Sequence, residues 1–476
     1  MIIRTADQSD QIDPHNSAEE SRIISELADW TLDEYSAGTA RCPYCNRSHS
    51  PAIRYIDICA DALNGLARRL DELGVRKPYV VADINTDRAA GEQTREALAA
   101  GGVQFIYHIL SGDEPVPDEA AVGDLLMGFD SSCDFILGVG SGVINDLCRF
   151  VSFQTGRRFG IIASAPSMDG FASTVAPLIR RSLKTTFIAH PPALIIGDTN
   201  ILSRAPRRLI AAGYADVVGK LNSLIDWKIA RLTVGEYYCP WVAAVMRLAL
   251  ERTLACADGL ARGDAEASRR LMEALTMAGL AMTYAGYSRP ASGFEHHLAH
   301  AWEMSFLRLG RKLIPHGVKV GLGTIAAAKL AKRIRSASVD WDESARAPAR
   351  LSVEAWEDEM RRVFGAAAPD IISLERSVQK NSPEKRATRL NAAREHWDEI
   401  RLLLAALPSG EQVVQTLRAV GSPVNPREIE LPREAVRDGI LYAKEVRDRY
   451  TQQQLAWDIG GLPGWAEEIT EELFNI

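Results

Sequence analysis

The chain has 476 residues, of which 46% are hydrophobic and 25% are charged. This length allows two or three domains, and the composition is typical of a soluble globular protein. The net charge of -7, without a basic run that contains aromatic residues, argues against a nucleic-acid partner. The polar, acidic N-terminus and the lack of an apolar run of about 18 residues argue against a signal peptide and a membrane span, so we expect a cytoplasmic protein.

The N-terminal segment contains a helical pattern over residues 18–35 and then a short cysteine motif. Cys42, Cys45 and His49 have the spacing of a zinc knuckle but are one ligand short of a structural zinc site. His15, a neighbouring subunit or a water would have to complete it. The alternative is a reduced cysteine pair in a loop, because seven cysteines, few and odd in number, indicate thiols rather than disulfides.

The next part of the chain alternates between strand-like and helix-like segments, which predicts a mainly parallel sheet with helices on both faces. The expected strands are 78–83, 103–107, 135–139, 159–163 and 193–196. Amphipathic stretches at 89–100 and 118–127 are expected to be helices.

Helical periodicity dominates the rest of the chain. The expected helices are 211–231, 241–258, 265–284, 297–309, 318–333, 355–364 and 384–407, and the charged stretch 340–350 is expected to be a solvated connection. The predicted fold class is therefore an α/β domain with a parallel nucleotide-binding sheet, followed by an all-α domain. The predicted division is an extension over 1–50, the α/β domain over 51–203 and the α-helical domain over 204–476.

A glycine-rich turn follows the third expected strand. Residues 135–146 run from an apolar strand through Gly138, Gly140 and Gly142 into a helix. Glycines at such a turn let backbone amides approach a diphosphate, and the helix N-terminus favours an anion. However, the spacing departs from G-x-G-x-x-G, and a tight turn needs glycine for steric reasons alone. A cofactor site and an ordinary turn remain alternatives.

Two later segments combine polar groups with apolar surroundings. Residues 164–173 place serines and Asp169 in a loop at the carboxyl edge of the expected sheet, where ligands bind in open α/β sheets, although such residues also form ordinary turns. Asp216 lies in an otherwise apolar helical start. A carboxylate there is bound to a metal, paired, or stabilised by the helix N-terminus.

Four of the nine histidines fall between positions 296 and 316. His296 and His300 are four residues apart and share one helical face, while His316 begins a second helix after Pro315. Two imidazoles and one carboxylate would form a divalent-metal site with positions left for substrate, and Asp216 is the best candidate for the carboxylate. The alternative is a polar helical face with surface histidines.

Five motifs occur in an order that resembles the sn-glycerol-1-phosphate dehydrogenases, in particular their bacterial, AraM-like branch. They are GVGSGVIND at 138–146, APSMDGF at 165–171, AGYADVVGK at 212–220, SRPASGFEHH at 288–297 and HGVKVG at 316–321. That family lies in the superfamily of iron-type alcohol dehydrogenases, glycerol dehydrogenases and dehydroquinate synthases. The resemblance implies a dehydroquinate synthase-like fold and has motif support over roughly residues 50 to 330.

The resemblance also implies the roles of individual residues. One divalent metal, zinc or nickel, is expected to bind Asp216, His296 and His316, with His297 as an extra histidine that could exchange roles with His296. Substrate contacts are expected from Asp169, Asp216 and His300, of which Asp169 and His300 are the catalytic candidates. The cofactor, NAD or NADP, is expected to contact Asp83, Gly140, Ser141, Gly142, Val143, Ile144, Asn145, Asp146, Ser164, Ala165, Pro166, Ser167 and Ser173. The acidic residue at position 83 favours NAD, because it suits a ribose diol and repels a 2′-phosphate.

The implied reaction interconverts dihydroxyacetone phosphate and sn-glycerol 1-phosphate, and phospholipid biosynthesis is the implied pathway. Arg289 and Lys220 flank the metal motifs and are the expected contacts for the substrate phosphate. A dehydrogenase for an unphosphorylated polyol, a dehydroquinate synthase-like cyclase or lyase, and a catalytically silent metal-binding scaffold are alternatives. The sequence leaves open whether the protein is a homo-oligomer.

Overall fold

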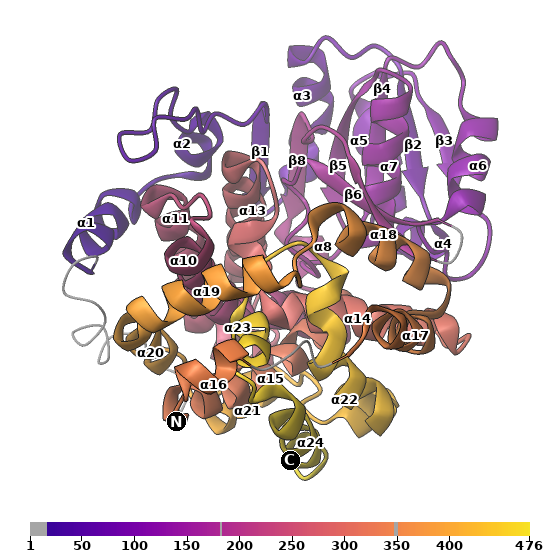
Figure 1. Ribbon diagram of the computed structural model, residues 1–476. Coiled ribbons are helices and arrows are strands. Elements are labelled where there is room, and N and C mark those ends of the chain that lie inside the picture. The colour runs from indigo at the N-terminus through magenta and orange to yellow at the C-terminus, as the bar shows by residue number, and fades with distance from the viewer. Residues whose placement is uncertain (1–16, 181–182, 347–350) are drawn as a thin grey trace. The chain divides into compact units, whose positions relative to one another are not determined.

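The computed structural model describes residues 17–180, 183–346 and 351–476, and Figure 1 shows their secondary structure. The chain divides into two compact units. One, here called the sheet unit, comprises Ile24–Val217 and Ala244–Ser288. The other, the helical unit, comprises Met1–Ile23, Val218–Ala243 and Arg289–Ile476. The position of His15 lies outside the described residues.

Within the described ranges, the sheet unit contains a six-stranded parallel sheet with the strand order β1-β8-β5-β4-β2-β3. The strands are β1 (Tyr55–Cys59), β2 (Pro78–Ala82), β3 (Ile106–Ile109), β4 (Phe135–Gly140), β5 (Arg158–Ala163) and β8 (Leu194–Asp198). The five strands expected from the sequence are confirmed, although β3 begins three residues later than predicted. The sequence analysis missed β1, a short strand that contains Asp57 and ends at an exposed residue.

Helices accompany these strands as the alternating pattern predicts (Figure 1). They are α3 (Leu66–Glu72), α4 (Ile84–Thr86), α5 (Glu92–Ala100), α6 (Glu119–Gly128), α7 (Gly142–Gln154) and α8 (Thr199–Leu202). All residues of β2, β4 and β8 are buried, which explains why these strands have nearly continuous apolar sequences. Their side chains form one hydrophobic core with Leu66 and Leu70 of α3 and Leu98 of α5.

The strand order contains one reversal that matters for ligand binding. From β2 the chain proceeds to β3 on one side, whereas β4, on the other side of β2, leads on through β5 and β8. In open parallel sheets such a reversal opens a crevice at the carboxyl ends of the two central strands. The segments that follow β2 and β4 therefore flank the position at which this architecture binds nucleotides.

An antiparallel hairpin of β6 (Val175–Arg180) and β7 (Leu183–Ile188) follows the 164–173 loop. The sequence analysis did not predict it. Its first strand contains Pro177 and is only partly buried, so it lacks the apolar run by which the sheet strands were found.

The remaining helices of the sheet unit are α9 (Arg207–Val218, whose last residue falls in the helical unit), α12 (Ala257–Arg262) and α13 (Ala265–Ala285). Helix α11 (Pro240–Ala255) begins in the helical unit and continues into the sheet unit. Two N-terminal helices, α1 (Ser17–Leu27) and α2 (Leu32–Ala37), replace the single helix expected over 18–35. The break is explained by Thr31, which begins α2 with a capping box to Glu34.

The helical unit contains α10, α14 to α24 and short 3-10 turns, as the helical periodicity predicts. The helices are α10 (Lys220–Val234), α14 (Phe294–Arg308), α15 (His316–Ser336), α16 (Trp341–Arg346), α17 (Val353–Phe364), α18 (Ala368–Val378), α19 (Pro383–Glu395), α20 (Trp397–Ala405), α21 (Gly410–Arg418), α22 (Arg433–Tyr442), α23 (Gln452–Asp458) and α24 (Leu462–Phe474). The described part of the charged stretch at 340–350 is largely helix α16, not the plain connection expected. Across the described residues, no helix is both long and apolar enough to cross a membrane.

Two expected helices are each divided in the structure. The pattern over 211–231 belongs to α9 and α10, which are separated at Gly219, and the pattern over 384–407 belongs to α19 and α20, which meet at His396. The expected domain boundaries at 50/51 and 203/204 remain predictions. The two compact units are each made of several separate segments of the chain, so they do not correspond to the expected domains.

Candidate active site

Helices α14 and α15 of the helical unit pack against each other and carry the clustered histidines. His316 is the first residue of α15, with Pro315 as its N-cap, as the sequence predicts. The rings of His296 and His300 each lie with their centroid 5.3 Å from that of His316. The i, i+4 pair therefore does present one face toward the start of the second helix. The close approach of the helices needs glycine at position 323, where a Cβ atom would lie 2.5 Å from the carbonyl oxygen of Glu295.

Two buried carboxylates hold the histidine rings. His296 Nδ1 lies 2.7 Å from Glu295 Oε1, and His316 Nδ1 lies 2.9 Å from Glu303 Oε1. A carboxylate only accepts hydrogen bonds, so each Nδ1 carries the proton and donates it. With Nδ1 committed in this way, Nε2 is the nitrogen that would bind a metal. Metal-binding histidines are commonly oriented by such a carboxylate.

Glu303 joins two further groups, His300 on α14 and Lys319 on α15. His300 Nδ1 donates to its Oε2 at 3.3 Å, and the buried Lys319 ammonium lies 3.2 Å from its Oε1. His300, Glu303 and His316 bring their ligand atoms within 4.8 Å of one another and are a second conceivable metal triad. The Lys319 charge would repel a cation bound directly to Glu303. We therefore interpret Glu303 as the carboxylate that orients the rings.

A buried polar network fixes the N-terminus of α14. Asp226 of α10 accepts the backbone N–H of Phe294 at 2.8 Å, and Glu295 Oε1 accepts that of Gly293 at 2.8 Å. The amide of Asn222 donates to both carboxylates. Burial raises the pKa of Asp226 to about 7. Burial also acts to raise the pKa of Glu295, but the hydrogen bond and positive charge of His296, with further hydrogen bonds, lower it below its usual value.

His297 points to a different environment from that of its neighbours. It is fully buried, and neither ring nitrogen has a hydrogen-bond partner among the described residues. Burial and the positive charges of Arg449 and Arg289 lower its pKa well below the usual value, so the ring is neutral. Neither ring nitrogen of His297 contacts a carboxylate, whereas His296 is oriented by Glu295. This difference favours His296 as the metal ligand.

The two expected phosphate contacts are engaged elsewhere. Arg289 is fully buried, its Nε donates to Glu236 at 3.1 Å, and its Nη2 donates to the carbonyl oxygens of Asp226 and Tyr450 at 2.7 Å each. Lys220 is also buried, and its Nζ donates to the carbonyl oxygen of Ala291 at 3.2 Å. These contacts identify Arg289 and Lys220 as residues that hold the helical unit together.

In the sheet unit, Asp216 lies in the last turn of α9 and not at a helix start. The helix dipole is unfavourable for a carboxylate at that end, so the interpretation of a charge stabilised by the helix N-terminus is wrong. Asp216 is buried, and its Oδ2 accepts the backbone N–H of Asp169 at 3.2 Å. Gly213, one turn earlier, allows this approach, because a Cβ atom there would lie 2.0 Å from the carbonyl oxygen of Pro166. The structure thus brings Asp216 and the Asp169 loop together.

The 164–173 loop is fixed from two sides. Arg149 of α7 donates to the carbonyl oxygens of Gly170 and Phe171 at 2.7 and 2.8 Å. The hydroxyl of Ser173 accepts the backbone N–H of Val175 at the start of β6. Ser164, Ser167 and Ser173 are all buried, as is Ala165, while Pro166 supports α9 through its close contact with Gly213. The loop is therefore a rigid element at the carboxyl end of β5.

The glycine-rich turn joins β4 to α7 at the same edge of the sheet. A Cβ atom at Gly140 would lie 2.5 Å from Ile144, so this glycine is required by packing alone. At Gly142 the nearest atom would be 3.7 Å away, which is ordinary contact, and packing does not explain that glycine. Ser141 is the N-cap of α7 but forms no capping hydrogen bond with its side chain. The turn thus leaves space and backbone N–H groups at a helix N-terminus, which fits a bound diphosphate.

Two predicted cofactor residues also have structural contacts. Asn145 and Asp146 on the first turn of α7, next to Val143 and Ile144, both contact the buried Arg149. Burial raises the pKa of Asp146 to about 6, while the nearby Arg149 charge opposes this rise. The two residues therefore help Arg149 to hold the 164–173 loop.

Asp83 directly follows β2, beside the reversal of strand order. It is buried and caps the short helix α4, because its Oδ1 accepts the backbone N–H groups of Asn85 and Thr86 at 2.7 and 2.9 Å. This position at the carboxyl end of β2 is where a dinucleotide site of this architecture meets the adenosine ribose.

The sequence analysis did not single out Glu295, Glu303 or Arg149. A glutamate before His296 and another at i+3 from His300 were visible as a pattern, since both lie within reach of the histidines on a helix. The contact of Arg149 with the loop carbonyls carried no sequence signal.

Comparison of the chain with known proteins identifies its family. The family of iron-containing alcohol dehydrogenases matches residues 57–206. Glycerol-1-phosphate dehydrogenase (NAD(P)+) of Halalkalibacterium halodurans is 33% identical over 82% of this chain and 89% of that protein. The enzyme of the same name from Bacillus subtilis is 31% identical over 82% of this chain and 87% of that protein. The chain belongs to the glycerol-1-phosphate dehydrogenase family.

The likeness to solved structures supports the fold. A probable glycerol dehydrogenase from Sinorhizobium meliloti matches 90% of this chain and 98% of its own with a TM-score of 0.57 and 15% identity. This member of the glycerol-1-phosphate dehydrogenase family therefore has the architecture of the iron-type alcohol dehydrogenases, as the sequence predicts.

Proposed function

We propose that this chain is a metal-dependent, NAD(P)-linked oxidoreductase that interconverts dihydroxyacetone phosphate and sn-glycerol 1-phosphate. Family membership supports the reaction. The observation that carries the proposal is the pair of imidazoles, His296 and His316, each oriented through Nδ1 by a buried carboxylate. That arrangement is typical of two ligands of one divalent ion. Histidines on an exposed polar face would not need a buried carboxylate to orient each ring.

We propose Asp216 as the third ligand, with zinc or nickel as the ion, since two imidazoles and a carboxylate bind either. The anchoring of Asp216 by the Asp169 N–H supports a fixed carboxylate. When bound, the ion supplies a Lewis acid that polarises the C2 carbonyl of the substrate. The chain's own residues then bind the substrate and move the proton.

His300 is the proposed proton donor to the C2 oxygen. Its Nδ1 is held by Glu303, and its ring stacks on His316 at an interplanar angle of 28°. Nε2 is therefore the nitrogen from which the proton would leave, and an imidazole is a common general acid. The Asp169 carboxylate is proposed to contact the substrate hydroxyl next to the carbonyl.

The substrate phosphate needs cationic side chains as its contacts. Arg447 and Arg449 follow the 3-10 turn Ala443–Val446, which packs against α14, and both act electrostatically on His297. We propose these arginines as the phosphate contacts in place of Arg289 and Lys220.

The cofactor is proposed to bind along the turn from Gly140 to Asp146, with Asp83 at the adenosine ribose and the serines of the 164–173 loop near the nicotinamide. Because the Asp83 carboxylate would repel a 2′-phosphate, NADH is the expected better cofactor. A cytoplasmic location and a role in phospholipid biosynthesis remain predictions from the sequence.

The test is reduction of dihydroxyacetone phosphate by NADH and by NADPH, on chelated enzyme reloaded with single metals. We expect no turnover without metal, turnover with zinc or nickel, a preference for NADH, and little activity on unphosphorylated dihydroxyacetone. Equal activity on the two ketones would support the polyol dehydrogenase instead, and turnover that is independent of metal would contradict the proposal.

A further inference from the structure

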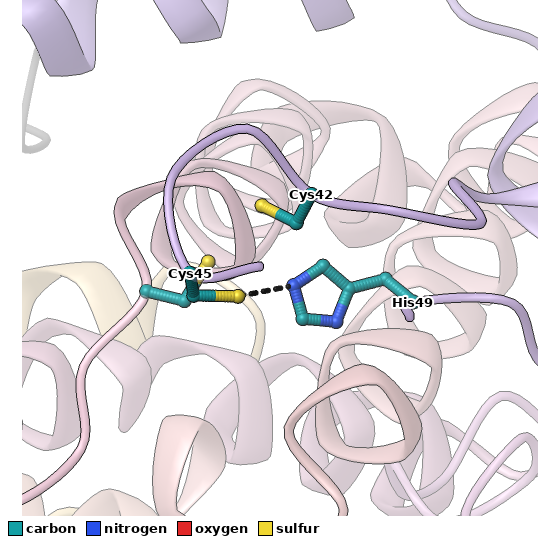
Figure 2. Close-up of side chains that lie close together, drawn as sticks. Cys42, Cys45 and His49 are labelled. Atoms are coloured by element: carbon teal, nitrogen blue, oxygen red, sulfur yellow. Dashed lines mark hydrogen bonds between the residues drawn. The ribbon is translucent and has the colours of Figure 1, made fainter. Parts of the chain in front are cut away.

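The sheet unit contains a second group of metal-binding side chains that the proposed reaction does not use. The side chains of Cys42, Cys45 and His49 point toward one another (Figure 2). Their ligand atoms all lie within 4.8 Å of one another, and Cys45 Sγ is 3.2 Å from His49 Nε2. Cys42 and His49 are almost completely buried. Two thiols and an imidazole that converge out of water form a set of donors suited to a soft or borderline metal ion.

The backbone holds this segment in a compact turn. The N–H of Cys42 donates to the carbonyl oxygen of Arg47, and the N–H of Asn46 donates to that of Cys42, both at 2.9 Å. Asn46 has a φ of 61°, a left-handed conformation that asparagine tolerates better than most residues. Thr39 and His49 then close the segment with a pair of antiparallel hydrogen bonds. The cysteines and the histidine are therefore positioned by main-chain contacts, so the site does not have to be assembled by the ion.

His49 is oriented as a ligand would be. Its Nδ1 lies 3.0 Å from the carbonyl oxygen of Tyr284 near the end of α13, to which it donates. This contact fixes the tautomer and makes Nε2 the nitrogen that faces Cys45. Zinc–sulfur and zinc–nitrogen bonds of about 2.3 and 2.0 Å in a tetrahedron require ligand atoms that are roughly 3.5 Å apart. The observed spacing meets that requirement after small adjustments.

We propose that Cys42, Cys45 and His49 bind a structural Zn²⁺ ion that is distinct from the proposed catalytic metal. On binding, each cysteine gives its thiol proton to solvent and coordinates as thiolate, without any change of oxidation state. The ion ties the N-terminal segment to α13 through His49. The site stabilises the fold and takes no part in hydride transfer.

A tetrahedral ion bound by these three side chains has a fourth position, which we assign to a water molecule.

The test uses the full-length protein loaded with Co²⁺ in place of zinc. Thiolate ligands give Co²⁺ a strong charge-transfer absorption in the near ultraviolet, which a site of histidine and aspartate lacks, so the proposed catalytic metal does not contribute. We expect the band in the wild type and its loss or strong reduction in Cys42→Ser and Cys45→Ser. The matched controls Cys59→Ser and Cys133→Ser should retain the full band.

Metal analysis gives a second readout. The wild type purified under reducing conditions should hold one zinc more per chain than Cys45→Ser, while the reductase activity of folded Cys45→Ser with its other metal is retained. If the serine variants fail to fold, His49→Cys keeps three protein ligands and should strengthen the charge-transfer band. A wild type without that band, or one whose band persists unchanged in Cys42→Ser and Cys45→Ser, overturns the proposal, whereas loss of reductase activity on metal reloading would concern the proposed function alone.

Discussion

Buried carboxylates hold Nδ1 of each candidate-site histidine and leave Nε2 for the proposed metal or substrate. Glu295 holds His296, while Glu303 holds both His300 and His316. In all three rings Nδ1 faces a carboxylate, but the proposed roles of the rings differ. His296 and His316 are proposed as ligands, and His300 is proposed to carry a proton.

The roles of His300 and His316 can be separated by substitution. We expect His316→Ala to lose bound metal and turnover together, because a site with three protein ligands loses much of its affinity with one of them. We expect His300→Ala to retain metal and to lose kcat by about 10²- to 10⁴-fold, the usual contribution of a general acid. Elemental analysis and steady-state kinetics measure the two effects. Equal metal loss in both variants would show that the roles are misassigned.

At the scale of secondary structure elements, the sequence predicted the existence of most strands and helices better than their ends. The strands β2, β4 and β8 were found because burial on both faces makes them continuously apolar. The edge strand β1 and the hairpin were missed because their residues are partly exposed. The sequence analysis placed Asp216 near the start of a helix. Because α9 ends before α10 begins, the structure places it near the end of α9.

The sequence predicted those parts of the candidate site whose residues are close together in the chain. The spacing of His296 and His300 indicates a common face, and Pro315 marks the start of the next helix. Contacts that join distant segments, such as that of the Asp169 N–H with Asp216, depend on tertiary packing and leave no local pattern. For the same reason, the sequence suggested Arg289 for phosphate, although the fold uses it to join α10 to Tyr450.

Glu303 connects two elements, since it lies on α14 and accepts from His316 at the first residue of α15. We expect Glu303→Gln to lower metal affinity by about 10- to 100-fold, the usual effect of removing such a carboxylate. An amide cannot accept from both histidines and also neutralise Lys319. Competition with a chelator of known affinity measures the change. Glu354→Gln on the exposed surface of α17 is the control, and unchanged affinity in Glu303→Gln would contradict the orienting role.

For the whole molecule, the proposed cofactor residues belong to the sheet unit, whereas the proposed histidine ligands belong to the helical unit. In the proposed reaction, the ion, the phosphate contacts and the nicotinamide would hold the substrate at three points, so hydride would reach only one face of the carbonyl. We expect one enantiomer of the product, and family membership indicates sn-glycerol 1-phosphate. The product of NADH and dihydroxyacetone phosphate is offered to a stereospecific sn-glycerol-3-phosphate oxidase, with authentic sn-glycerol 3-phosphate as the control. Resistance of the product to oxidation is the expected result, and its complete consumption would reject the proposed reaction.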